Sequence, residues 1–177
     1  TFKVVIAGNA RYDVINSLDL FPSRTTDGYE LYEICHKTNN VLNKKIDVNM
    51  WVFNEFQGVA KLNMLSSSDG IILCIKNEKK LNLLEFAYYR DVILNSEIPL
   101  IGLIIVNDDD KYEELVIPDS FSHLIWNKIA TTKKNKIKNV AYFKNYFNEL
   151  SSIVFDDSIR TNNLIYETDL CLNKNTS

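Results

Sequence analysis

Glycine and proline are scarce in this sequence, with five and three among 177 residues. Tight turns depend on these two residue types, so their scarcity argues against an all-β fold built from many short hairpins. Histidine is scarcer still. His36 and His123 lie far apart and beside no candidate nucleophile, so no catalytic residue is expected. Apolar residues nevertheless make up 46% of the chain, which is ample for one compact core.

Cysteine is also sparse, and Cys35, Cys74 and Cys171 show no spacing typical of a metal or redox site. Cys35 and Cys74 lie in apolar, strand-like runs, which predicts buried thiols in a reducing compartment. No apolar run approaches the roughly 18 residues of a membrane-spanning helix. The net charge of -3 lacks the basic excess of nucleic-acid-binding proteins. We therefore expect a cytoplasmic protein that reaches membranes only through its partners.

Short apolar runs alternate with amphipathic segments along the chain. This alternation is typical of an α/β fold with helices on both faces of a mostly parallel sheet. The expected strands are residues 4–7, 29–37, 45–53, 71–75, 100–106 and 121–126. The expected helices are residues 13–20, 59–65, 81–94 and 140–155, and a long polar loop spans residues 127–139.

The second and third expected strands alternate in polarity around a polar turn, which predicts an antiparallel hairpin. The sheet is therefore expected to have six strands, one of them antiparallel. Asp13 is the candidate N-cap of the first helix. Residues 1–155 are expected to form one domain, followed by a tail over residues 156–177 that is partly disordered or docks on a surface.

The turn after the first strand has the position of a phosphate-binding loop. The spacing of the motif G-x-x-x-x-G-K-[ST] places its first glycine on Gly8. The second glycine, the lysine and the hydroxyl residue fall on Asp13, Val14 and Ile15. The position is kept, but these side chains supply neither a cation for phosphate nor a ligand for Mg²⁺.

Four strings over residues 2–155 resemble the Ras/Rab family of small GTPases. They run from Phe2 to Gly8, from Ile46 to Phe53, from Ser68 to Ile75 and from Ile98 to Asn107. They look like the first, third, fourth and fifth strands of that family, in the same order and at similar spacing. The resemblance implies a Ras-like G-domain with helices on both faces of its sheet.

The family's nucleotide motifs are degenerate here. Val52 and Glu55 stand where the motif after the third strand has its metal-coordinating aspartate and its glycine. Asn107 and Asp110 match the base-reading motif, but Asp108 replaces its lysine. Each lost charge-assisted contact costs roughly 1.5–3 kcal/mol, so several losses remove the ~12 kcal/mol of nanomolar binding. The resemblance therefore implies a pseudo-GTPase with no cofactor, no bound GTP and no catalysis.

Such a domain would act through protein–protein contacts, as a subunit or accessory factor of a larger assembly, with membrane trafficking the favoured setting. Trp51 and Phe56 fall where the family exposes its effector-binding surface, although Trp51 also suits a core strand. The lysines Lys133, Lys134 and Lys136 suit a solvated loop, an acidic partner or an anionic membrane surface.

Three alternatives remain open at this point. The chain could be a divergent active GTPase in which Arg11 and loop lysines replace the missing lysine. It could serve a kinetochore or cytoskeletal assembly. It could also be a receiver-like signalling domain, although the hairpin and the absence of paired acids after the first strand argue against that fold.

Overall fold

The computed structural model describes residues 1–38, 44–55, 65, 67–78, 82–108 and 117–153. The strands are β1 (Phe2–Ala7), β2 (Arg24–Thr25), β3 (Tyr29–Lys37), β4 (Lys45–Phe53), β5 (Gly70–Lys76), β6 (Leu100–Asn107) and β7 (Asn127–Thr132). The helices are α1 (Arg11–Ser17), α3 (Asn82–Ser96), α4 (Asp119–Ser122) and a long helix over residues 136–153, called here the 136–153 helix.

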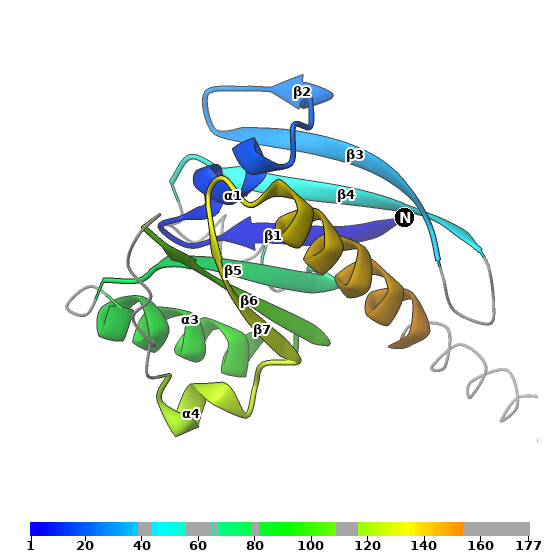
Figure 1. Cartoon of the computed structure of the whole chain (residues 1–177). Coiled ribbons are helices and arrows are strands. Elements are labelled where there is room, and N and C mark those ends of the chain that lie inside the picture. Colours follow the sequence, from blue (N-terminus) through cyan, green and yellow to red (C-terminus); the bar gives the residue numbers. More distant parts are fainter. Residues whose placement is uncertain (39–43, 56–64, 66, 79–81, 109–116, 154–177) are drawn as a thin grey trace, which may run out of the picture.

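All seven strands form one sheet in the order β2-β3-β4-β1-β5-β6-β7 (Figure 1). The neighbours from β4 through β1, β5 and β6 to β7 pair in parallel, whereas β3 is antiparallel to both β4 and β2. The β3–β4 hairpin runs in register from the pair Tyr29 and Phe53 to the pair Lys37 and Lys45. The predicted α/β fold, the mostly parallel sheet and the antiparallel hairpin are confirmed, and β2 adds a seventh strand.

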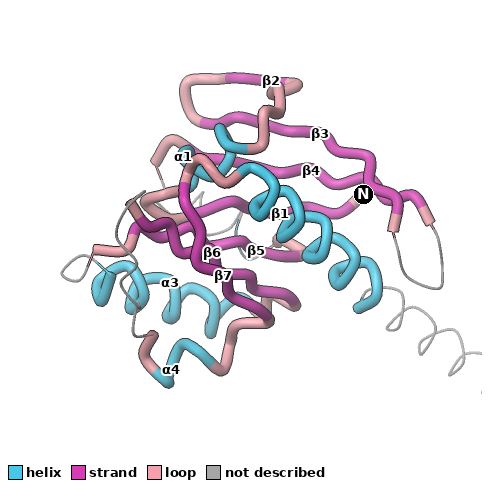
Figure 2. The backbone as a smooth tube through the Cα atoms, viewed as in Figure 1, coloured by secondary structure: helices cyan, strands magenta, loops and turns pink. Residues whose placement is uncertain are grey.

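Helices cover both faces of the sheet, which makes two separate apolar clusters (Figure 2). Alternate residues of each parallel strand point to opposite faces, so the strands are apolar along their whole length. On one face α1 and the 136–153 helix bury Val14, Phe143 and Phe147. On the other face α3 and α4 bury Phe86 and Phe121.

The predicted strand at residues 121–126 is wrong. Residues 119–122 form α4, and the last strand is β7, in the stretch that was expected to be a polar loop. The apolar side chain that suggested a strand, Phe121, packs instead on Phe86 of α3, with ring centroids 5.0 Å apart. β7 is an edge strand, and only part of it faces the core. It therefore carries β-branched residues such as Ile129 and Thr131 without a continuous apolar run.

Helix boundaries differ from expectation at two places. α1 begins at Arg11 with Ala10 at the N-cap position, so the prediction of Asp13 as the cap is wrong, and Asp13 lies within the first turn. The last helix begins at residue 136, before the expected 140, and buries Phe143, Phe147 and Leu150 as predicted. The expected helix over residues 59–65 lies outside the described residues except Leu65, which is helical and buried. The tail over residues 156–177 also lies outside them.

The prediction that both strand cysteines are buried holds for Cys74 and is wrong for Cys35. Cys74 lies in the central strand β5 and is covered on both sides. Cys35 lies on β3 next to the exposed side chains of Glu33 and Lys37, on the face of the hairpin that no described helix covers. Alternation alone could not distinguish a covered from an uncovered face of the hairpin.

Candidate functional site

The connection between β1 and α1, where the sequence placed a phosphate loop, is only three residues long. It consists of Gly8, Asn9 and Ala10. A phosphate loop needs a wide turn whose backbone N–H groups surround the phosphate. Here the helix has already begun at the positions of the motif's lysine and hydroxyl residue. Val14 and Ile15 face the core, with exposed fractions of 0% and 1%.

N–H groups at both ends of this connection already have acceptors within the protein. Gly8 N–H donates to the hydroxyl of Tyr89 on α3 at 3.1 Å. Ala10 N–H donates to the carbonyl of Cys74 at 2.9 Å, and Arg11 N–H donates to the carbonyl of Gly8 at 3.2 Å. Because these groups are satisfied internally, they are not available to surround an anion.

Gly8 is required by a close approach of the backbone to β5. Its φ is +101°, which L side chains rarely adopt. A Cβ at this position would lie 2.1 Å from the carbonyl oxygen of Cys74. The glycine thus serves the packing of the turn against the neighbouring strand, and its presence does not require a ligand.

The guanidinium of Arg11 fills the space between this turn and the end of β4. Its Nε donates to the carbonyl of Phe53 at 2.8 Å. One terminal nitrogen donates to the carbonyl of Gly8 at 2.9 Å, and the other donates to the carbonyl of Asn54 at 2.6 Å. The planar fork of arginine suits this bridging geometry. The cation is therefore held by backbone oxygens of the turn after β1 and of the end of β4.

Tyr12 adds a second link between the start of α1 and the end of β4. Its hydroxyl donates to Oδ1 of Asn54 at 2.5 Å, and the Arg11 guanidinium lies 4.6 Å from the centroid of its ring. The Asn54 amide in turn donates to the carbonyl of Asp27. The turn after β1, the end of β4 and the loop before β3 are thereby tied to one another through Asn54.

Burial sets the protonation of the groups around Arg11. Partial burial raises the pKa of Glu85 on α3, and the positive charge of Arg11 opposes this shift. Burial also raises the pKa of the Tyr89 hydroxyl and of the Cys74 thiol, with the Arg11 charge again opposing it. Cys74 therefore stays a neutral thiol, and a nucleophilic role for it is not supported.

The residues at the positions of the other two nucleotide motifs are buried in the fold, exposed beyond a strand end, or outside the described residues. Val52 is fully buried in β4, and Glu55 is exposed just beyond that strand. Asn107, the counterpart of the base-reading asparagine, is buried and accepts a hydrogen bond from Nδ2 of Asn77 at 2.5 Å. Asp108 is exposed, whereas Asp110 lies outside the described residues. Among the residues that the structure describes, no three histidine, cysteine or acidic side chains form a cluster that could hold a metal ion.

The candidate partner-binding residues are dispersed. Trp51 is half-buried on β4, 5.0 Å from the ring of Tyr29 and 6.4 Å from that of Phe53. Phe56 lies outside the described residues. Lys133 and Lys134 are exposed in the turn after β7. Trp51 lies on β4, whereas Lys133 and Lys134 follow β7, and β1, β5 and β6 lie between these two strands in the sheet.

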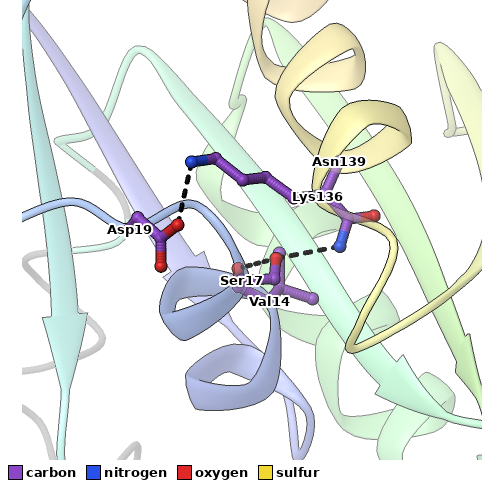
Figure 3. A network of polar contacts seen from close by, with 5 residues as sticks. All are labelled: Val14, Ser17, Asp19, Lys136 and Asn139. Atoms are coloured by element: carbon purple, nitrogen blue, oxygen red, sulfur yellow. Dashed lines mark hydrogen bonds and ion pairs between the residues drawn. The ribbon is translucent and has the colours of Figure 1, made fainter.

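Lys136 belongs to a polar joint between α1 and the 136–153 helix (Figure 3). Its Nζ forms an ion pair with Asp19 at 2.8 Å. Beside it, Asn139 is fully buried and donates from Nδ2 to the hydroxyl of Ser17 at 2.9 Å, which donates in turn to the carbonyl of Val14 at 2.5 Å. Asn139 also accepts from the hydroxyl of Thr131 at 2.7 Å.

Sequence reasoning missed the parts of this site that depend on tertiary contacts. The roles of Asn54 and Tyr89 have no local signal, because each acts on a segment far away in the sequence. Asn139 follows a lysine-rich run that suggests a solvated loop, yet it is completely buried. A buried asparagine whose side chain is bonded by α1 and β7 could be found only after these elements had been placed.

Comparison with known proteins adds no further constraint. A scan against models of protein families finds no match, and a search of curated proteins finds none. Within the described part of the chain, no helix is both long enough and apolar enough to span a bilayer.

Proposed function

We propose that this chain is a Ras-like domain that binds no guanine nucleotide and acts through protein–protein contacts. Two features support the Ras-like assignment. The sheet has β1 at its centre and a β3–β4 hairpin that contributes the antiparallel strand, as the family resemblance implies. The four strings that resemble the family fall on β1, β4, β5 and β6, which are neighbours in this sheet.

The observation that carries the proposal is the position of Arg11. Its guanidinium bonds the carbonyls of Gly8, Phe53 and Asn54, between the two segments that bind phosphate and Mg²⁺ in an active family member. A phosphate at this place would have to displace those bonds. The domain thus holds with its own side chain the loops that a nucleotide holds in an active enzyme.

The domain would serve as a subunit or accessory factor of an assembly, and membrane trafficking is the setting that the family resemblance favours. Trp51 and Phe56 would contribute an aromatic contact, and Lys133, Lys134 and Lys136 a cationic contact to an acidic partner surface. A kinetochore or cytoskeletal assembly is the alternative setting. Contact with membranes would then be indirect, through the partner.

The nucleotide part is tested by titrating fluorescent GDP and GTP analogues, with Mg²⁺, into the full chain. We expect no saturable binding, and no nucleotide released when the freshly purified protein is denatured. An active small GTPase provides the positive control. Arg11→Ala tests whether the side chain alone excludes the ligand, and we expect it to gain no binding because Val14 and Ile15 remain in the core. Micromolar or tighter binding by the natural chain would support the divergent-GTPase alternative instead.

The partner part is tested by affinity capture from cells followed by mass spectrometry. The comparison is between the natural chain and a variant with Lys133→Glu and Lys134→Glu, whose side chains are exposed. We expect trafficking subunits to be enriched by the natural chain and depleted by the variant. Enrichment of kinetochore or cytoskeletal proteins would favour the alternative assembly, and an unchanged profile would exclude these lysines from the contact.

A further inference from the structure

The two edges of the sheet are protected very differently. At the β7 edge, side chains of the 136–153 helix bond two strand carbonyls. Lys138 Nζ donates to Ala130 O at 2.5 Å, and Asn139 Nδ2 donates to Thr132 O at 3.3 Å. Such contacts are a way of closing an edge strand to further pairing.

At the other edge, β2 covers only the first part of β3. Its two residues pair with Glu30 and Leu31, and the adjoining Ser23 N–H donates to Leu31 O at 2.8 Å. Outward-pointing backbone groups recur at every second residue of a strand, so those of Glu33, Cys35 and Lys37 also point away from β4. No described segment of the chain pairs with this second half of β3.

The side chains of this open stretch are complementary to their own copy. An antiparallel pairing about a twofold axis at Cys35 would place Glu33 of each copy directly opposite Lys37 of the other. The three residues are exposed on one face of the strand. Lys37 lies opposite Lys45 within the hairpin, a like-charge pair, and no carboxylate of the described residues forms an ion pair with it. Glu33 of a second copy would supply that carboxylate.

An apolar groove of about 350 Å³ lies beside the same stretch of β3. Ile34 and His36 form one wall, and Leu20, Phe143 and Phe147 contribute to the others. Phe21, which follows Leu20 in the chain, is a large apolar side chain that is 93% exposed to solvent. In the pairing described above, Ile34 of each copy lies opposite His36 of the other, so the two grooves meet along the axis and cover each other's apolar walls.

We infer that the chain forms a homodimer in which two β3 strands pair antiparallel about Cys35 and join the two sheets into one. The backbone of Glu33, Cys35 and Lys37 supplies the hydrogen bonds, the grooves supply apolar contact, and the Glu33–Lys37 pairs fix the register. This dimer extends the proposed function and does not depend on it, because the nucleotide and capture experiments can fail while the dimer stands.

Charge reversal tests the register by sedimentation equilibrium across a dilution series. The natural chain should show a monomer–dimer equilibrium. Glu33→Lys and Lys37→Glu, each alone, should raise the dissociation constant about tenfold, because two attractive pairs become repulsive. The double variant, which exchanges the two charges, should restore it. Lys128→Glu, an exposed residue on the opposite sheet edge, is the matched control and should leave it unchanged.

Crosslinking tests the position of the axis. In a Cys171→Ser background, a short bis-maleimide should link two copies through Cys35, since Cys74 is buried, and Cys35→Ser should abolish the product. A chain that stays monomeric at every concentration would overturn the inference. So would reversals that leave the equilibrium unchanged, a charge exchange that fails to restore it, or crosslinking that survives Cys35→Ser.

Discussion

Removal of the Arg11 guanidinium should destabilise the domain measurably, although the residue resembles a surface side chain in the sequence. Two of its three hydrogen bonds are partly buried and one is exposed. With a net value of about 1–1.5 kcal/mol for each partly buried bond and about 0.5 kcal/mol for the exposed one, Arg11→Ala should cost about 3 kcal/mol. The loss should exceed that of an ordinary surface substitution several-fold.

Two companion variants separate the charge from the bridge. Arg11→Lys keeps the charge, but a single ammonium cannot span three carbonyls, so a loss of about 2 kcal/mol is expected. Arg11→Met keeps much of the aliphatic stem and should fall between the lysine and alanine variants. Arg90→Ala is the matched control, because among the described residues Arg90 forms an ion pair with its neighbour Asp91 alone, at 3.4 Å and largely exposed, and should cost less than about 0.5 kcal/mol.

The assay is urea unfolding of each variant, followed by the fluorescence of Trp51 on β4 and of Trp126, which directly precedes β7. The midpoint should shift while the slope with denaturant stays constant, since the surface exposed on unfolding is unchanged. If Arg11→Ala and Arg90→Ala shifted the midpoint equally, the three hydrogen bonds of the Arg11 guanidinium would not stabilise the fold. Arg11 would then not hold the turn after β1 against the end of β4.

Three further predictions concern the backbone turn, the polar joint and the buried phenols. Gly8→Ala should cost more than about 3 kcal/mol or prevent folding, because Gly8 has a φ of +101° and an added Cβ would lie 2.1 Å from a β5 carbonyl oxygen. Gly28→Ala is the control: the nearest atom to an added Cβ lies at 4.0 Å, so the cost should be less than about 0.5 kcal/mol. Equal urea midpoints for the two variants would contradict the close approach at Gly8. Asn139→Leu should cost about 2–4 kcal/mol, because the half-buried hydroxyl of Ser17 and the buried hydroxyl of Thr131 would lose this partner. Lys136→Ala, which removes an exposed ion pair, should cost less than about 0.5 kcal/mol. The reverse ranking in urea unfolding would show that Asn139 does not stabilise the contact between α1 and the 136–153 helix. Burial raises the pKa of Tyr146 well above its usual value, so as pH rises the unfolded chain loses this proton before the folded chain does. The free energy of unfolding, measured by urea titration, should therefore fall as pH rises above about 10. A free energy that stays constant across that range would contradict the burial of this hydroxyl.

The strands at the centre of the sheet were predictable because they are buried on both faces. β1, β5 and β6 consist almost entirely of apolar residues, a pattern that few other structures share. The β3–β4 hairpin was predictable from alternation. The edge strand β7 was not, because an edge strand buries few of its side chains and its polar residues resemble those of a loop.

The apolar run over residues 121–126 led to the wrong assignment for a related reason. Periodicity in six residues cannot separate a strand from a helical turn followed by a loop. Pro118 lies three residues before the run at the N-cap position of α4, which begins at the next residue. Phe121 is then buried in the apolar cluster on the α3 side of the sheet, where it contacts Phe86, although it does not belong to a strand.

Part of the candidate site was likewise predictable from the sequence and part was not. The missing lysine and hydroxyl of the phosphate loop were visible at Val14 and Ile15 in the sequence. The bridge made by Arg11 was not, because its acceptors at Phe53 and Asn54 lie over forty residues away and are backbone atoms. A sequence records which side chains are present, whereas the carbonyls that they meet depend on where the strands end.

The short connection between β1 and α1 also constrains how this protein can change. A lysine placed at Val14 or a serine at Ile15 would enter the closed core, where an unpaired charge or hydroxyl is strongly destabilising. The motif's spacing from Gly8 to Ile15 is already present, but α1 begins at Arg11, inside the stretch that would have to form the wide turn. For this domain, phosphate binding would therefore require the first turn of the helix to unwind as well as new side chains at Val14 and Ile15.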